Sequence, residues 1–132
     1  MKDKILTRNA RSAASRPHVV QTMGGFVLEG LYAPQFRGME LADQCRAAFE
    51  EAVPLLEAHD LTLRDVSRIV CHIADADEFP ASFPVFRQFF STTSPGMTMM
   101  WLKNAPSSVP KIMIDLIINV PQDEELEAGA GF

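Results

Sequence analysis

The sequence predicts an α+β domain in which one mixed β-sheet carries two helices on the same face. Three observations support this class: a hairpin signal near the start, two segments with helical periodicity, and β-prone segments between and after them. Their order is ββαβαββ. Strands joined through helices, with a hairpin at each end, favour a single sheet with both helices packed on one side.

The first predicted elements are a hairpin over residues 18–32 and a long amphipathic helix. Gly24-Gly25 separates two short apolar runs, which is typical of a tight hairpin turn. The helix begins near Glu40 and spans about 19 residues. Its apolar positions recur at steps of three and four: Leu41, Cys45, Ala48, Phe49, Ala52 and Leu56. We expect Pro54 to kink or interrupt the final turn, because proline lacks a backbone donor.

A strand over residues 66–74 and a second helix within residues 75–90 follow. Asp77 or Glu78 is predicted to cap this helix, and Pro80 suits its first turn. Four phenylalanines are then expected on one side of the helix: Phe79, Phe83, Phe86 and Phe90.

The closing elements are strands over residues 97–104 and 111–120, joined by a loop rich in proline and serine. The last strand is apolar at almost every position, which predicts that both of its faces are covered. The chain contains only enough helix for one covering layer. We therefore expect another copy of the protein to cover the second face of the sheet.

The composition excludes several classes of protein. The chain has 132 residues, enough for one domain that buries about two-thirds of its unfolded surface. The formal net charge is −5 and there is no basic stripe, which argues against a nucleic-acid partner. No apolar run reaches the length of a membrane span and no secretory signal is present, so we expect no membrane partner and a cytoplasmic location.

We expect three regions along the chain: an N-terminal arm over residues 1–16, the domain over residues 17–121, and an acidic, disordered tail over residues 122–132. The arm is basic and rich in serine, which suits either a transit peptide or an ordinary arm. Cys45 and Cys71 lie in apolar patterns and are expected to be buried. No Cys, His and carboxylate cluster has ligand spacing, so the sequence predicts neither a metal nor a cofactor.

Asp115 stands at the centre of an otherwise apolar segment, residues 111–120. A buried carboxylate without a partner costs several kcal/mol, so this acid must be paired, protonated or in contact with water. One interpretation is a general acid or base. The other is an ion pair with Lys111, Lys103 or an arginine of a neighbouring copy.

Several stretches in this order resemble the Rid (YjgF/endoribonuclease L-PSP) family over residues 17–120. They are GGFVLEGLYAP, the first helix, DVSRIVCHIADADEFPASFPVFRQFF, SPGMTMMWL and KIMIDLIINV. The resemblance implies a chorismate-mutase-like fold and a homotrimer with ligand clefts between subunits. Active members hydrolyse enamines and imines, and a Pro-x-Arg segment holds the substrate carboxylate.

This chain departs from the family at the implied site. The Pro-x-Arg segment reads Pro95-Gly96-Met97, and Met113 replaces the first glutamate of the last strand. Loss of the arginine together with the glutamate keeps the cleft apolar and neutral. We therefore expect an inter-subunit cleft free of guanidinium, and an ordinary 2-imino-acid deaminase is disfavoured.

The resemblance and the residue types together predict which residues form the site. The catalytic candidates are Asp115 and His18. The ligand-binding candidates are Glu29, Gly30, Tyr32, Phe83, Met97, Met99, Trp101 and Met113. His18 also suits a surface strand, and Tyr32 and Trp101 also suit plain packing between subunits. His72 and His59 are weaker candidates.

Two functions remain open. One is an enzyme that acts on a small metabolite, an enamine, imine or unsaturated ring compound, as a deaminase-like hydrolase or an isomerase. The other is a non-catalytic trimer that binds small molecules or proteins. Ribonuclease activity, proposed for some relatives, fits the acidic charge poorly.

Overall fold

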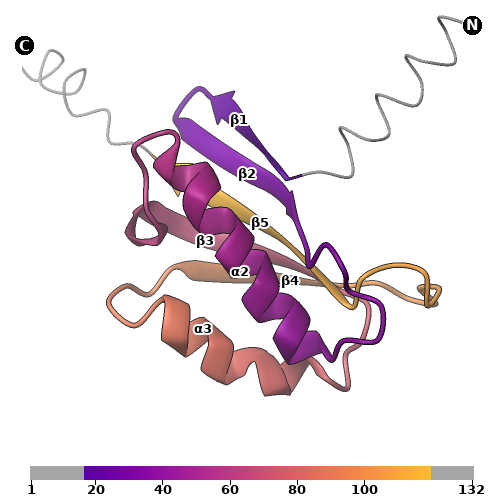
Figure 1. The fold of residues 1–132 in the computed structure, drawn as a ribbon. Helices are drawn as coiled ribbons and strands as arrows, with labels where there is room; N and C mark the ends of the chain where they lie inside the picture. Colours follow the sequence, from indigo (N-terminus) through magenta and orange to yellow (C-terminus); the bar gives the residue numbers. More distant parts are fainter. Residues whose placement is uncertain (1–16, 120–132) are drawn as a thin grey trace, which may run out of the picture.

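The computed structural model describes residues 17–119, and the predicted arm and tail lie outside these residues. The strands form one five-stranded sheet. Figure 1 shows that this sheet is twisted and that the α-helices lie across one of its faces. The strands are β1 (His18–Thr22), β2 (Gly25–Leu31), β3 (Val66–Ile73), β4 (Gly96–Trp101) and β5 (Ile112–Asn119). The helices are α2 (Leu41–Glu57) and α3 (Phe83–Phe89), with short 3₁₀ turns at Leu63–Asp65 and Phe79–Ser82. The predicted ββαβαββ order is confirmed.

The sheet is mixed, as predicted, with the spatial order β1-β2-β5-β3-β4. The predicted closing hairpin is wrong, because β3 lies between β4 and β5. The pair β3 and β4 is parallel, and the other neighbouring pairs are antiparallel. The last strand in the sequence therefore lies in the middle of the sheet. Its central position explains why the sequence of β5 is so apolar.

The apolar residues predicted to form one side of helix α2 are buried: all six are fully inaccessible to solvent. The predicted interruption at Pro54 is wrong, since the helix continues to Glu57. Proline removes one donor near the end of the helix, but its own carbonyl still accepts from Ala58 N at 3.0 Å. The final turn therefore closes despite the proline.

The second helical segment begins as a 3₁₀ turn at Phe79 and becomes α-helical at Phe83. The predicted cap is wrong: Glu78 makes no cap here, and its Oε1 accepts instead from Leu41 N, at the start of α2, at 2.7 Å. Phe83 is 46% exposed, whereas the other three phenylalanines are buried. The change from 3₁₀ to α geometry at this residue shifts the phase of the helix and turns the side chain outward.

Alternate residues of β5 face opposite sides of the sheet. The even-numbered residues from Ile112 to Ile118 are buried in the core that includes α2, while Met113, Asp115 and Ile117 are only half-buried. We call the side of the sheet away from α2 and α3 the open face. Its central members are Val27, Arg68, Val70, His72, Met113, Asp115 and Ile117.

One buried polar side chain secures the start of β5. Gln44, 1% exposed on α2, donates from Nε2 to the carbonyls of Phe36 and Met39 at 3.2 and 2.9 Å. Its Oε1 accepts from Lys111 N at 2.9 Å. This amide therefore ties the loop before α2 to the strand that carries Asp115.

Candidate functional site

Asp115 lies opposite a bulge in β2. Leu28 pairs with Leu116 and Leu31 pairs with Ile114, so Glu29 and Gly30 together face the single residue Asp115. Gly30 adopts a φ of 77°, which glycine reaches without steric cost. Its N–H donates to Asp115 Oδ1 at 2.9 Å. The carboxylate thus accepts from an amide at the place where the strand pairing is irregular.

The other oxygen of this carboxylate is bonded to His72 on β3. The distance from His72 Nε2 to Asp115 Oδ2 is 3.0 Å, and the two side chains are 27% and 25% exposed. The predicted ion pair between Asp115 and Lys111 is wrong, because Lys111 Nζ binds Glu78 Oε2 at 2.8 Å. We judged His72 a weak candidate from the sequence, and the structure makes it the partner of Asp115.

The sequence did contain a signal for this pair. His72 in β3 and Asp115 in β5 each stand between apolar residues, and polar residues at such places in neighbouring strands often pair. The signal was missed because it depends on the register. Val70 faces Asp115 and His72 faces Met113, so the two polar residues meet diagonally across two strands that are far apart in the sequence.

His18 and Glu29 extend the polar groups of the open face toward its β1 edge. They are register partners, and His18 Nε2 lies 3.2 Å from Glu29 Oε1. Both side chains are about half exposed, at 46% and 49%. Four polar residues therefore form a row across β1, β2, β5 and β3: His18, Glu29, Asp115 and His72.

The apolar candidates divide between two faces of the sheet. Met97, Met99 and Trp101 align with the inward-facing residues of β3, so they point to the helical side. Met97 packs against the core, and the Trp101 ring meets the Phe79 ring at 5.7 Å. Met113 lies on the open face. The predicted pocket with walls from both sets is not formed within one chain, and it stays a prediction about an assembly.

The open face is not free of guanidinium. Arg68 aligns with Gly96 and donates from Nη1 to Thr98 Oγ1 at 3.0 Å. A side chain at Gly96 would place its Cβ 2.9 Å from Nη2 of Arg68, so the guanidinium covers that glycine. Arg68 lies at the end of this face next to the edge strand β4, and the expectation of an inter-subunit cleft free of guanidinium stays a prediction about an assembly.

The two cysteines are buried, as predicted. Burial, with a smaller contribution from the charge of Asp115, raises the pKa of Cys71 to about 12. Burial also raises the pKa of Cys45. Both thiols are therefore protonated at neutral pH and are poor nucleophiles.

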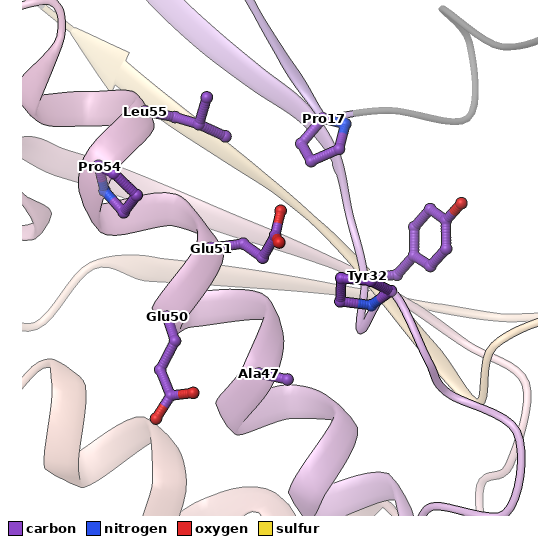
Figure 2. A pocket seen from close by; sticks show the side chains of 8 residues that line it. Pro17, Tyr32, Ala47, Glu50, Glu51, Pro54 and Leu55 are labelled. Atoms are coloured by element: carbon purple, nitrogen blue, oxygen red, sulfur yellow. The ribbon is translucent and has the colours of Figure 1, made fainter.

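Tyr32 lies away from the open face. It lines a groove of about 770 Å³ between the end of β2 and the outer side of α2. Figure 2 shows Glu50, Glu51 and Pro54 of α2 on one side of this groove and Tyr32 with Pro17 on the other. Asp115 is not among the residues that line this groove.

Within residues 17–119 no three His, Cys, Asp or Glu side chains form a group that could hold a metal ion. None of the helices in this part of the chain is long and apolar enough to cross a membrane.

Comparisons of the sequence with family models and with curated proteins find no match. Comparison of the structure with solved structures does find matches. A member of the YjgF/YER057c/UK114 family from Mycobacterium tuberculosis superposes with a TM-score of 0.68, over 84% of this chain and 92% of that chain, at 23% identity. The chain has the YjgF fold.

Two further structures agree with the YjgF fold. TdcF from E. coli, solved with bound serine, has a TM-score of 0.66 at 22% identity and covers 79% of this chain and 87% of its own. Yeast Mmf1 has a TM-score of 0.69 at 14% identity and covers 82% and 89%. The resemblance to the Rid family and the chorismate-mutase-like fold that it implied are thus confirmed at the level of fold.

Proposed function

We propose that this protein binds, and acts on, a small unsaturated metabolite at the open face of its sheet. The ligand class is an enamine, an imine or a ring-type compound, and the cleft is completed by neighbouring copies in a homotrimer. The observation that carries the proposal is the Asp115–His72 pair. It is a partly exposed acid–base pair on a sheet face that α2 and α3 leave uncovered.

The surroundings of this pair suit a mostly apolar ligand. Val70, Met113 and Ile117 are half-buried neighbours on the same face. Ligand sites typically combine such apolar walls with a few fixed polar groups. Here the fixed groups are a carboxylate, an imidazole and a backbone amide at Gly30.

A second apolar patch gives a reason to expect other copies around the site. Phe83, Met99 and Trp101 are 46%, 44% and 52% exposed on the helical side of the β4 edge. Exposed apolar clusters of this kind mark contact surfaces. In the proposed trimer, this patch of one copy and the open face of the next form the two walls of the cleft.

The ligand is unlike the substrate of an ordinary 2-imino-acid deaminase. At the position of the family arginine, Met97 packs into the core and offers no charge. Arg68 comes from another strand and already bonds Thr98. TdcF, which shares the fold, was solved with bound serine, which supports binding of a small molecule by this architecture.

One observation favours a second function, binding without catalysis. Both oxygens of Asp115 have partners within the chain, so a purely structural role, securing β2 and β3 to β5, accounts for this carboxylate without any catalysis. The open face would then offer an apolar surface to a small molecule or a protein segment.

A thermal-shift screen tests the proposal. Conjugated imines, unsaturated amino acids, planar ring acids and short apolar peptides are screened against the wild type, Met113→Glu and the distant control His59→Gln. We expect a compound to raise the Tm of the wild type and of His59→Gln, and the rise to disappear in Met113→Glu, because a charge enters the apolar wall. Stabilisation by peptides alone supports the second function, and equal shifts in all three proteins place the ligand elsewhere and contradict both.

A further inference from the structure

We propose that His72 is the proton-transfer residue of this site, with Nδ1 as the general base and Asp115 as the residue that positions the ring. The inference rests on the proposed function, because it requires that a ligand reaches the open face. It names the chemistry that the site performs: removal of a proton from a neutral, conjugated ring or enamine compound.

The tautomer of His72 follows from its partner. An ionised carboxylate can only accept hydrogen bonds, so Nε2 of His72 carries the proton that bonds Asp115 Oδ2 at 3.0 Å. The second nitrogen, Nδ1, is then the unprotonated one. Among residues 17–119 no hydrogen bond to Nδ1 is formed, and the side chain is 27% exposed, so in our proposal this lone pair receives the proton of a ligand.

Asp115 is itself held in place. Gly30 N–H donates to Oδ1 at 2.9 Å from a glycine whose φ of 77° orients the amide. The carboxylate cannot turn away from His72 without losing this bond. The amide, the carboxylate and the imidazole are therefore hydrogen-bonded in series. The carboxylate fixes the ring and stabilises the imidazolium that forms during proton transfer.

His72 is better suited to this role than the predicted candidate His18. The side chain of His18 is 46% exposed on the edge strand β1 and is paired with Glu29, which is itself 49% exposed. His72 is 27% exposed on β3, between β5 and β4, and it faces Met113 and Met100 in the register. The ring of His72 is thus less exposed to bulk water than that of His18, and its partner carboxylate offsets the cost of forming the imidazolium there.

The other charged groups of the open face lie at its two ends. Glu29 on β2 and its partner His18 on β1 lie beyond Asp115. Arg68 precedes His72 by four residues on β3, where its guanidinium covers Gly96. The immediate neighbours of the ring are therefore one carboxylate and apolar side chains. This setting suits a neutral substrate better than an anion, because the carboxylate repels a second negative charge.

The probe 5-nitrobenzisoxazole tests the base directly. It is a neutral, planar ring compound. Nδ1 takes the proton from its C3–H bond, the electron pair forms the nitrile, the N–O bond breaks, and 2-cyano-4-nitrophenolate leaves while the imidazolium returns its proton to water. Atoms and electrons balance without a co-reactant. The product is measured by its absorbance.

We expect the wild type to exceed His72→Gln by about 100-fold, the lower end of what a positioned base contributes. His59→Gln is the matched control, since His59 is an exposed histidine at the end of α2. It should keep the wild-type rate. Equal rates for the wild type and His72→Gln would overturn the inference.

Ring NMR of His72 separates a catalytic role from a structural one. In ¹⁵N-labelled wild type we expect the Nε2–H tautomer, and the pKa of the ring should equal the pKa in the pH–rate profile. In Asp115→Asn the tautomers should mix and the rate should fall at least tenfold, although the chain stays folded. An Nδ1–H tautomer in the wild type, or a pH profile with a different pKa, contradicts the proposal.

The same samples distinguish the inference from the proposed function. Binding of the probe is followed by the Tm of the wild type and of Met113→Glu. If the probe binds the open face but His72→Gln reacts at the wild-type rate, the inference fails and the proposed function stands. If Met113→Glu binds the probe as well as the wild type, the open face is not the binding site and both fail.

Discussion

The two faces of the central sheet use the same strands for different purposes. On the covered side, β5 contributes Ile112, Ile114, Leu116 and Ile118 to a core that is almost free of polar groups. On the open side the same strand contributes Met113, Asp115 and Ile117. The buried core lies on the first face, and our proposal places the chemistry on the second. Side chains of one strand reach both faces because they alternate with a period of two residues.

The largest expected effect comes from replacing one isoleucine on each face of β5 with alanine. Ile114→Ala, at 0% exposure, should lower the free energy of unfolding by about 2–5 kcal/mol, because it leaves a cavity in the core. Ile117→Ala, half-buried on the open face, should cost much less in a dilute single chain. Urea denaturation measures both. Equal losses would mean that the open face is part of the monomer core.

The second test removes the buried side-chain amide of Gln44 from the covered face. Gln44→Leu should cost about 2–3 kcal/mol, because Lys111 N–H and two carbonyls lose their partner in a buried place. Glu57→Leu changes an exposed position of the same helix and should have little effect. If Gln44→Leu is as stable as Glu57→Leu, this amide does not secure the start of β5.

The bulge on the open face predicts a smaller effect. Gly30→Ala forces an L-residue to a φ of 77° and should cost about 1–2 kcal/mol. Gly38→Ala imposes a similar φ of 80° in a loop with open space around it. Only Gly30→Ala should also change the His72 ring spectrum, because it displaces the amide that holds Asp115. A ring spectrum that is the same in both variants would separate the bulge from the site.

The smallest expected effect concerns the pair Glu78 and Lys111. The hydrogen bond from Lys111 and that from Leu41 N–H hold the pKa of Glu78 below its ordinary value of 4.5. Its contribution is therefore present above pH 4.5 and is lost as the pH falls through the lower, folded value. The same bond raises the pKa of Lys111 above 10.5, so its contribution is lost only in alkali.

Both side chains are about one-third exposed, so the pair should contribute less than about 1 kcal/mol. We expect Lys111→Met to flatten the fall in stability between pH 5 and pH 3, measured as Tm against pH, relative to the wild type. An unchanged slope would show that the pair does not contribute. Arg64→Met serves as a control for loss of one exposed cation.

Much of the covered face was predictable from the sequence. The stripe of α2 and the order of the strands follow from periodicities that local chemistry imposes, and the structure confirms them. The errors at Pro54 and Phe83 arose where a helix end or a 3₁₀ turn departs from the ideal repeat. Glu78 was assigned to the helix that follows it, because sequence reasoning sees only local caps, and it contacts a distant one.

The site was less predictable because it depends on contacts between strands that are distant in the sequence. Asp115 was identified by its polarity in an apolar strand, but its partner His72 follows only from the register of β3 and β5. The bulge at Gly30 and the position of Arg68 over Gly96 also depend on pairing. How Met97, Met99 and Trp101 meet the open face depends on other copies, and it stays a prediction.

Sedimentation equilibrium of the wild type and of Ile117→Arg tests the central claim, that the open face is covered by other copies to make a ligand cleft. Ile117 lies at the centre of that face, beside Val27 and Arg68 in the register. We predict three times the chain mass for the wild type at tens of micromolar, and a single folded chain for the variant. A single chain for the wild type, or an unchanged assembly in the variant, would contradict the account.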